Sequence, residues 1–513
     1  MSDVLGARTA PVLEVAARAA ARAERRMLID GELRAAADGA EFDNIAPATG
    51  QVLGGTAAAC AADMERAIGA ARRAFDETDW PVNRALRKRC LEQLQAALES
   101  ERAELGEELI AEAGCPAMTL TNAQVDWPLA EALRYPLRLI DEFGWERVLP
   151  GGGLFGERNV RTVVQEPVGV VAAICPSNFP VEVVLNKIGP ALAAGNTVVL
   201  KPDPNTPWNA TRLGRLVAER TDFPPGVLNV VTTADNAVAG LLATDPRVDM
   251  ISFTGSTAVG KHLVRTAADT MKRTFLELGG KSALIVLDDA DPLAALRSAV
   301  GVCVHAGQAC AATSRMLVPR HLVDEITAQV AAAFDAVQPA DPALPDTLVG
   351  PLISAAQQRR VLDACERGVR DGARLVTGGG IPEAIAPHLR GGFFVRPAVF
   401  ACADNSLPIA RDEIFGPVLV VIPHDGDDDA VRLANDSDYG LAGAVLSSSP
   451  ERGMAVARRV RTGAIGVNGG MFYGADAPFG GVKQSGLGRQ CGPEGFQQYL
   501  ETKTIGTRSP RPR

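Results

Sequence analysis

The chain has 513 residues, of which 47% are hydrophobic and 22% are charged, with a formal net charge of −9 and a pI near 5.3. This length exceeds one ordinary core and predicts two or three globular domains, with disorder confined to the chain ends. The acidic balance argues against the basic surface that nucleic-acid binding requires.

The nine cysteines and five histidines show no spacing typical of a metal site or a disulfide framework. No CxxC pair and no H-E-x-x-H sequence occurs, and most cysteines lie in apolar or helical runs. We therefore predict reduced thiols in a cytoplasmic protein, with no bound metal. No apolar stretch reaches the roughly 18 residues that a membrane helix needs, which predicts a soluble protein.

The N-terminal part of the chain is expected to support the fold. Val12 to Arg26 is rich in Ala and Arg, but its acidic residues and the lack of an apolar signal core indicate a helical extension, frayed or docked, and not a targeting peptide. Residues 27–60 alternate short apolar runs with turn signals and predict small strands. Between Asp63 and Phe143 the apolar residues keep helical spacing, which predicts packing helices.

A glycine-rich break at 150–153 comes next, and residues 158–165 then alternate as an exposed strand does. Beyond it, runs rich in Val, Ile and Leu alternate with helical segments as far as residue 278. Continuous apolar runs between helices are typical of a parallel sheet covered on both faces. The strands are predicted at 168–174, 197–200, 228–231 and 249–253, and the helices near 183–194, 207–219 and 256–267. The fold class is therefore α/β, with a Rossmann-like domain that takes a ligand at the carboxyl edge of its sheet.

A second α/β domain is predicted from about residue 279 to 483, with strands at 283–287, 314–318, 418–422 and 464–467. Within it, Asp291-Pro292 begins a helix whose apolar periodicity continues to Val304, and Gly307 breaks it. Cys310 follows this break between two alanines and is open to a small electrophile. Cys303 lies inside the periodic run, where a cysteine usually serves as a small buried hydrophobe.

Three further places combine polar groups with an informative setting. Residues 254–256, Thr-Gly-Ser, join a predicted strand to a helix whose first amides could meet a phosphate, although many strand-to-helix turns use Gly-Ser. Glu277 lies between leucines beside two glycines, a setting that raises a carboxyl pKa toward the working pH of a general base. Asn178 follows the strand 168–174 and could either stabilise an oxyanion or cap the next helix.

Six motifs occur in one order along the chain and together resemble the aldehyde dehydrogenase superfamily, from about Met27 to the C-terminus. They are Pro-Ser-Asn-Phe-Pro at 176–180, Phe-Thr-Gly-Ser at 253–256, Leu-Glu-Leu-Gly-Gly-Lys-Ser at 276–282, Gly-Gln-Ala-Cys at 307–310, Glu-Ile-Phe-Gly-Pro-Val at 413–418 and Pro-Phe-Gly-Gly-Val-Lys-Gln-Ser-Gly at 478–486. The resemblance implies a dinucleotide-binding domain, a catalytic domain and a small β arm for oligomerisation, in a homodimer or homotetramer. The implied ranges are 1–148 with 168–278, then 279–483, then 149–167 with 484–513.

The resemblance also implies the chemistry, which is oxidation of an aldehyde to its carboxylic acid with NAD(P) through a thioester on Cys310. Asn178 and the backbone N–H of Cys310 would form the oxyanion hole, and Glu277 would activate the water that hydrolyses the thioester. Lys187 and Asn468 would orient these groups. The positions implied to bind the cofactor are Pro176, Ser177, Lys201, Gly255, Ser256, Glu413 and Phe415, with Ser256 on the pyrophosphate, Lys201 on the adenine ribose, and Glu413 and Phe415 at the nicotinamide end.

The sequence departs from the family pattern at three positions. Pro204 stands where NAD-preferring members usually carry Glu, so we expect NAD to be preferred but leave NADP open. His305 replaces a frequent Asn and is expected to support the loop, and Gln490 replaces a frequent Glu. Because relatives that acylate coenzyme A typically lack Glu277, its presence favours water as acceptor. A coenzyme A-acylating dehydrogenase remains one alternative, and a thiol hydrolase that uses Cys310 without a nucleotide is another.

The resemblance finally implies an aldehyde tunnel with mostly apolar walls. No Arg or Lys stands among its residues, and a dicarboxylic semialdehyde would need such a cation. We therefore predict a hydrophobic aldehyde, either medium-chain aliphatic, terpenoid or aromatic. Glu182 and Asn186 leave open a hydroxylated or amino-substituted substrate. The implied tunnel residues are Phe179, Val183, Val304, Phe472, Tyr473 and Phe479.

Overall fold

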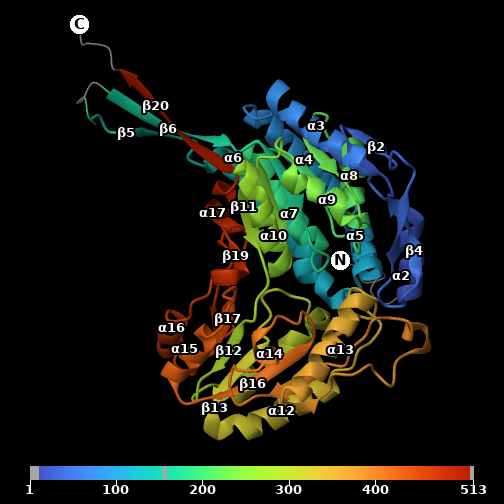
Figure 1. The fold of residues 1–513 in the computed structure, drawn as a ribbon, viewed down its shortest axis with the longest axis vertical. Helices are drawn as coiled ribbons and strands as arrows, with labels where there is room; N and C mark the ends of the chain where they lie inside the picture. The colour runs from blue at the N-terminus through green and yellow to red at the C-terminus, as the bar shows by residue number, and fades with distance from the viewer. Residues whose placement is uncertain (1–10, 153, 155–158, 509–513) are drawn as a thin grey trace.

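The computed structural model describes residues 11–152, 154 and 159–508. Two sheets covered by helices lie one beyond the other along the long axis, and a narrow arm projects from the first (Figure 1). This architecture confirms the predicted α/β class. Among the helices of the described ranges, none is both long and apolar enough to cross a membrane.

The first sheet has eight strands in the order β19-β11-β10-β7-β8-β9-β1-β2. Its five central strands are parallel, and each strand predicted in this region is present with its ends shifted by at most two residues. The four predicted strands are β7 (Val170–Ile174), β8 (Thr197–Lys201), β9 (Leu228–Val230) and β10 (Met250–Thr254). The fifth central strand, β11 (Arg273–Glu277), was not among the predicted strands. The outer strands β1 (Met27–Ile29), β2 (Glu32–Arg34) and β19 (Gly486–Leu487) are antiparallel to their neighbours.

Both faces of this sheet are covered because successive side chains of a strand point to opposite faces. In β7, Val171 and Ala173 pack into one apolar core, and Val170 and Ala172 pack into another. On the first face lie α4 (Arg84–Ser100), α6 (Arg134–Glu142), α7 (Pro180–Ala194) and α8 (Trp208–Arg220), and on the other lie α3 (Ala61–Glu77) and α9 (Asn236–Thr244). This double cover explains why the strands are apolar along their whole length.

The predicted helical region 63–143 is helical with interruptions. After α5 (Arg102–Glu108), three π-helical turns precede α6, at Leu109–Ala113, Leu120–Gln124 and Pro128–Ala132. The N-terminal extension is docked: α2 (Val12–Arg22) buries Val12 and Val15, and the Val12 amide donates to Asp341 Oδ2 at 3.1 Å. A small antiparallel pair, β3 (Glu41–Ile45) with β4 (Val52–Ala57), completes this region.

The second sheet has seven strands in the order β14-β15-β16-β13-β12-β17-β18 and encloses its own core. All of its pairs are parallel except β14 with β15. Its strands are β12 (Ala283–Val286), β13 (Arg315–Pro319), β14 (Arg374–Thr377), β15 (Ala398–Ala401), β16 (Val418–His424), β17 (Gly443–Leu446) and β18 (Gly466–Val467). The main helices around it are α11 (Pro292–Val300), α12 (Val323–Ala336), α13 (Ala355–Arg370), α15 (Asp427–Asn435) and α16 (Pro450–Ala457).

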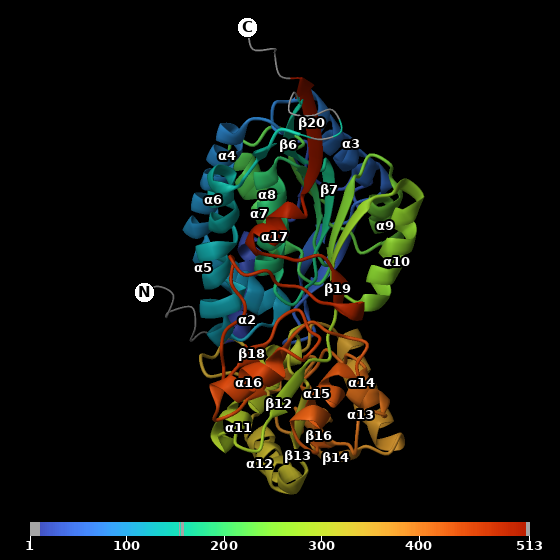
Figure 2. The same cartoon turned by 90° about the vertical axis from the view of Figure 1, so that its left-hand side faces the viewer.

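The arm is a three-stranded antiparallel sheet in the order β20-β6-β5 (Figure 1). It comprises β5 (Glu146–Leu149), β6 (Asn159–Pro167) and β20 (Leu500–Arg508), and β20 pairs with β6 over its full length. The range 484–513 was expected to join the arm, and among its described residues, 484–508, only β20 does so. The strand β19 pairs with β11, and α17 (Gly492–Gln497) packs against α6 and α7 beside the first sheet (Figure 2).

Candidate active site

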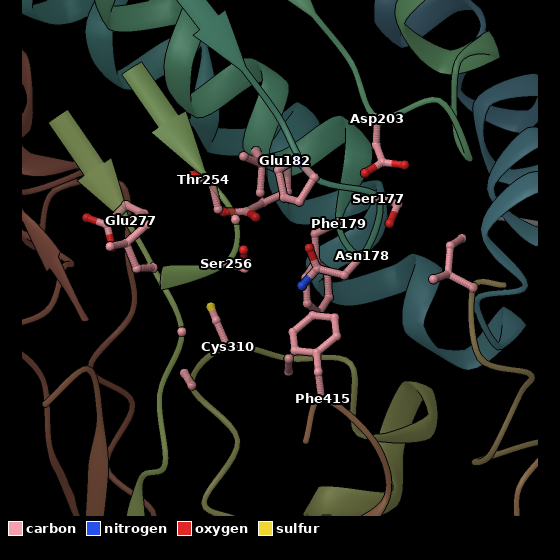
Figure 3. Close-up of a pocket in the computed structure, with 18 of the residues that line it drawn as sticks. Ser177, Asn178, Phe179, Glu182, Asp203, Thr254, Ser256, Glu277, Cys310 and Phe415 are labelled. Carbon is pink, nitrogen blue, oxygen red and sulfur yellow. The ribbon is translucent and has the colours of Figure 1, made fainter. Parts of the chain in front are cut away.

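A cavity of about 550 Å³ opens at the carboxyl ends of β7, β10 and β11 (Figure 3). The second sheet supplies its other wall through the loops that carry Cys310 and Phe415. Most residues implied by the family motifs line this cavity, although they are spread over more than 300 positions of the chain. They are Pro176, Ser177, Asn178, Phe179, Val183, Gly255, Ser256, Glu277, Cys310, Glu413, Phe415, Phe472, Tyr473 and Phe479. Lys187, Lys201 and Val304 are not among its lining residues.

The loop that carries Cys310 depends on an unusual backbone. As predicted, Asp291 caps α11, and its side chain accepts a hydrogen bond from the Leu293 amide at 3.0 Å. The following 3-10 turn has positive φ at His305, Ala306 and Gly307. At Gly307 an added Cβ would lie 2.2 Å from the Gly416 carbonyl oxygen, so only glycine fits there. This reversal turns the chain toward the cavity, where the Cys310 thiol points (Figure 3).

Burial raises the pKa of the Cys310 thiol, and the nearby carboxylates of Glu277, Glu182 and Glu413 raise it further. The free cysteine is therefore a thiol at neutral pH, and a base must remove its proton before it can act as a nucleophile. Cys303 is fully buried in the core of the second sheet, as expected of a packing residue.

Asn178 lies between β7 and α7 and reaches toward the same loop. Its Nδ2 donates to the Gln308 carbonyl at 2.9 Å, and its side chain faces the space in front of Cys310 (Figure 3). The alternative role as a helix cap is wrong, because the N-cap position of α7 is Phe179 and has no side-chain cap. An amide group has two N–H donors, so one remains for a ligand.

His305 contacts the backbone of Asn178. Its Nε2 lies 3.0 Å from the Asn178 carbonyl oxygen, which also accepts from Gln124 Nε2 at 2.9 Å. Burial lowers the pKa of His305 to about 4, so the ring is neutral at physiological pH. Since His305 is not among the lining residues and bonds to the backbone, its contacts match the expected role in supporting the loop.

Glu277 ends β11 and is 5% exposed. Neither of its carboxylate oxygens has a hydrogen-bond partner among the described residues. Burial raises its pKa to about 8, while the charges of Lys187 and Arg489 oppose the shift. An unpartnered carboxylate is costly to bury, so its presence at the cavity wall indicates a chemical role and not a stabilising one.

Lys187 and Asn468, which were expected to orient the reacting groups, both lie outside the cavity lining. Lys187 is fully buried in α7, where its Nζ donates to Ser252 Oγ at 3.3 Å and lies 4.9 Å from the centre of the Phe275 ring. Burial lowers its pKa. Asn468 Oδ1 accepts from the Ser447 amide at 2.9 Å beside β17 and β18. Lys187 can therefore act on Glu277 through its charge, whereas Asn468 bonds to the backbone that follows β17.

A second region of the cavity suits a dinucleotide. Ser256 caps α10 (Thr257–Ala267), and Ser256 Oγ accepts from the Val259 amide at 3.4 Å, leaving the other first-turn amides for an anion. Glu413 Oε1 accepts from the Gly280 amide at 3.1 Å, and burial raises the pKa of Glu413 to about 7. An added Cβ at Gly279 would lie 1.9 Å from Glu413 Oε2, so this glycine makes room for the carboxylate. The helix terminus and the buried carboxylate fit the phosphate and ribose groups of such a cofactor.

The strand end of β8 holds two cavity residues that sequence reasoning missed. Asp203 and Asn205 flank Pro204 and line the cavity, with Asn205 Nδ2 donating to Asp203 Oδ1 at 2.7 Å. Lys201 lies at the end of the same strand, and its Nζ donates to the Pro202 carbonyl at 3.1 Å. The signal available in the sequence was their position directly after a predicted parallel strand.

The remaining wall of the cavity is largely aromatic. The rings of Phe472 and Phe479 stack with centroids 6.5 Å apart, and Tyr473 meets Phe479 edge-on at 4.9 Å. Glu182 interrupts this apolar wall. Val304, expected in the tunnel, is half-buried in the 3-10 turn behind it. Thr254 of the Phe-Thr-Gly-Ser motif also lines the cavity. Further lining residues that no motif had indicated are Ala123, Ile353, Ser354, Gln357, Arg360 and Met471.

The fold and site thus define a two-sheet α/β protein with a cysteine at the carboxyl edge of a Rossmann-like sheet. A sequence model described as the aldehyde dehydrogenase family matches residues 34–505. Geranial dehydrogenase of Castellaniella defragrans is 39% identical over 465 residues, covering 90% of this chain and 94% of the relative. The NADP/NAD-dependent aldehyde dehydrogenase PuuC of Escherichia coli is 37% identical over 486 residues, covering 94% and 95%.

Solved structures agree with these relatives. The crystal structure of betaine aldehyde dehydrogenase from Staphylococcus aureus in complex with NAD+ superposes with a TM-score of 0.92 at 33% identity, covering 97% of each chain. The chain therefore belongs to the aldehyde dehydrogenase family, which confirms the resemblance. It is an NAD(P)-dependent enzyme that oxidises an aldehyde to the carboxylic acid.

Proposed function

We propose that Cys310 is the nucleophile of this oxidation, Asn178 its oxyanion donor and Glu277 its general base. One observation carries the proposal, which is that these three side chains, from three separate segments of the chain, line one cavity at the carboxyl edge of the first sheet. A cysteine, an amide donor and an unpartnered base are the parts that thioester chemistry requires.

The reaction begins with loss of the Cys310 proton to solvent, while Glu277, whose pKa is raised to about 8, stays free to act as the base of the later hydrolysis. The thiolate adds to the aldehyde carbon, and Asn178 Nδ2 with the Cys310 backbone N–H stabilises the resulting alkoxide. NAD, when bound, supplies the hydride acceptor. Glu277 then activates a water that hydrolyses the Cys310 thioester, and the acid leaves.

The groups that would hold NAD come from both sheets. Ser256 and the α10 amides suit the pyrophosphate, Glu413 the nicotinamide ribose, and Phe415 the side of the ring. Pro176, Ser177 and Gly255 shape the walls between them, and Lys201 at the end of β8 would bind the adenine ribose. Near that strand end the Asp203 carboxylate would repel a 2′-phosphate, which supports a preference for NAD. The charge is not at position 204 itself, so NADP stays open as a weaker cofactor.

The alternatives have less support. Glu277 provides a base for hydrolysis, which favours water over coenzyme A as the acyl acceptor. A thiol hydrolase without a nucleotide would need a base paired with Cys310 in the manner of a Cys-His pair. His305 is the histidine nearest in sequence, but it is bonded to the Asn178 carbonyl and lies outside the cavity lining.

Further features belong to the same proposal. Phe179, Val183, Phe472 and Phe479 support an aldehyde with an apolar body, and one relative is named a geranial dehydrogenase. The projecting arm supports a homodimer or homotetramer, and nine cysteines without disulfides support a cytoplasmic enzyme. We assign the first sheet and its helices to the cofactor domain and the second to the catalytic domain.

The proposal is tested by following NAD(P)H absorbance across a panel of aldehydes with NAD and with NADP. The wild-type protein should reduce NAD with an aldehyde, and Cys310→Ala should abolish this activity. Cys303→Ala is the matched control, because Cys303 is a packing residue of the neighbouring turn, and this variant should keep most of the activity. Equal loss in both variants would contradict the assignment of Cys310.

A further inference from the structure

Glu182 is a buried carboxylate for which the proposed reaction has no use. It lies in the first turn of α7, is 6% exposed and lines the cavity among aromatic side chains. Its Oε1 accepts from the Tyr473 hydroxyl and from Asn186 Nδ2, the latter at 2.5 Å. Gln490 Nε2 donates to the same hydroxyl at 3.2 Å. Three polar residues therefore hold one oxygen of Glu182 in place at the cavity wall.

The other oxygen of Glu182 has no partner of this kind. Within the described residues, no hydrogen bond reaches Oε2, and Glu182 forms no ion pair with a lysine or arginine side chain. Burial raises the pKa of Glu182 to about 7 and the charge of Lys187 opposes this shift, but Lys187 Nζ donates its hydrogen bond to Ser252 Oγ at 3.3 Å and not to Glu182. A carboxylate withdrawn from water without a cation is unfavourable, so such a group is retained where it meets a ligand.

The surroundings of Glu182 point to a cationic ligand. The cavity lining contains the carboxylates of Asp203, Glu182, Glu277 and Glu413 and one cation, Arg360. Close to Glu182, Tyr473 presents an aromatic ring whose other neighbour is Trp127, with ring centroids 5.1 Å apart. Aromatic faces and a carboxylate together attract an ammonium group and disfavour an anion. Phe472 and Phe479 provide an apolar part of the same cavity lining for the rest of the substrate.

We propose that this enzyme takes aldehydes that carry an ammonium group, and that Glu182 binds this group through its free carboxylate oxygen. The inference rests on the proposed function, since it concerns the substrate of the same cavity. Glu182 is then a specificity residue, whereas Tyr473, Asn186 and Gln490 are positioning residues that orient it. The apolar-tunnel prediction is refined by this proposal: the body of the substrate is apolar and one end is charged.

The test compares aldehydes of equal size that differ in charge. We would measure kcat/KM for 3-aminopropanal against butanal, and for 4-aminobutanal against pentanal, because each pair replaces an ammonium by a methyl group. We expect the amino compound of at least one pair to be preferred by about tenfold or more. In Glu182→Gln this ratio should fall by about 10- to 100-fold, the range expected for loss of one hydrogen bond to a charged group. Glu182→Asp retains the charge and should restore part of the preference.

A second measurement does not depend on turnover of the amine. Butylammonium should compete with butanal in the wild-type enzyme and inhibit Glu182→Gln at least tenfold more weakly. Tyr473→Phe keeps the Glu182 carboxylate, so butylammonium should inhibit this variant more nearly as it inhibits the wild type. The proposal would be overturned if Glu182→Gln left both the amino-to-alkyl ratio of kcat/KM and the inhibition by butylammonium unchanged. It would also be overturned if the wild type preferred 3-hydroxypropanal over butanal as strongly as it prefers 3-aminopropanal. If no aldehyde is oxidised by the wild type, the proposed function itself fails, which is a separate outcome.

Discussion

Glu277 shows how a single residue gains its chemistry from its surroundings. Its carboxylate lies at the end of a buried strand without a hydrogen-bond partner in the described chain, and burial raises its pKa from 4.5 to about 8. Gly480 approaches so closely that an added Cβ would lie 2.5 Å from Glu277 Oε1. The base is thus kept away from other donors and is available to a water in the cavity.

This pKa predicts the pH dependence of turnover. A general base works only when deprotonated, and the pKa of Glu277 is raised, so thioester hydrolysis should be slow at pH 6 and rise to a plateau above about pH 9. Glu277→Gln should lower steady-state turnover by about 10²–10⁴ and remove this rise. The measurement is kcat against pH for both proteins. A wild-type profile that is flat over this range would contradict the role of Glu277.

Sequence alone could identify the main residues of the site, but not the hydrogen bonds that hold Glu182 at the cavity wall. Cys310 follows a helix break, Asn178 follows a strand, and Glu277 lies between leucines beside two glycines, and such local settings can be recognised in the sequence. Glu182 lies inside a helix, and its side chain is held at the cavity wall by a hydrogen bond from Tyr473, which is nearly 300 positions away in the chain. The family resemblance implied that Val304 lines the tunnel, but His305 and Ala306 adopt positive φ, which turns the chain away from a regular helix.

At the level of elements, the connection between β11 and β12 joins the two halves of the site. Glu277 ends β11, and the glycines that follow let the chain pass Glu413 and Cys310. An added Cβ at Gly280 would lie 2.8 Å from the Cys310 carbonyl oxygen. Parallel strands and covering helices could be predicted from apolar runs, because double burial leaves a plain compositional signal. The short strands β14 and β19 carry no such signal.

Gly279→Ala should weaken cofactor binding. The new Cβ would lie 1.9 Å from Glu413 Oε2, so the carboxylate must move and lose its 3.1 Å bond to the Gly280 amide. We expect the Kd for NAD, measured by calorimetric titration, to rise about tenfold, equivalent to about 1.4 kcal/mol. Gly301→Ala is the matched control, because nothing lies within 4 Å of its added Cβ. An unchanged Kd in Gly279→Ala would show that Glu413 does not contact the cofactor.

In the whole molecule the proposed chemistry lies between the two helix-covered sheets, and the described part of the arm projects away from both (Figure 1). Side chains of Val148 and Ile505 are 66% and 44% exposed on this arm. Its nine-residue pairing of β20 with β6 joins segments that are more than 300 residues apart, so the sequence could suggest it only through the family resemblance. An exposed sheet of this kind is normally covered by another chain.

Deletion of residues 502–513 should therefore change the oligomeric state. This removes most of β20 and exposes the edge of β6, so we expect the mass measured by light scattering to fall from an oligomer to a monomer. Deletion of only 509–513 leaves β20 intact and should preserve the oligomer. An unchanged mass for the longer deletion, with native circular dichroism, would argue against assembly through the arm.

The central claim is that aldehyde carbon becomes a thioester on Cys310, and mass spectrometry of a slowed enzyme tests it most directly. Glu277→Gln, mixed with an aldehyde and NAD and then quenched in acid, should carry an acyl group on Cys310. Its mass should increase by that of the aldehyde less two hydrogens, as hydride transfer requires. The double variant Glu277→Gln/Cys310→Ala should show no increase. An adduct on another cysteine, or no adduct while NADH is formed in the first turnover, would contradict the account.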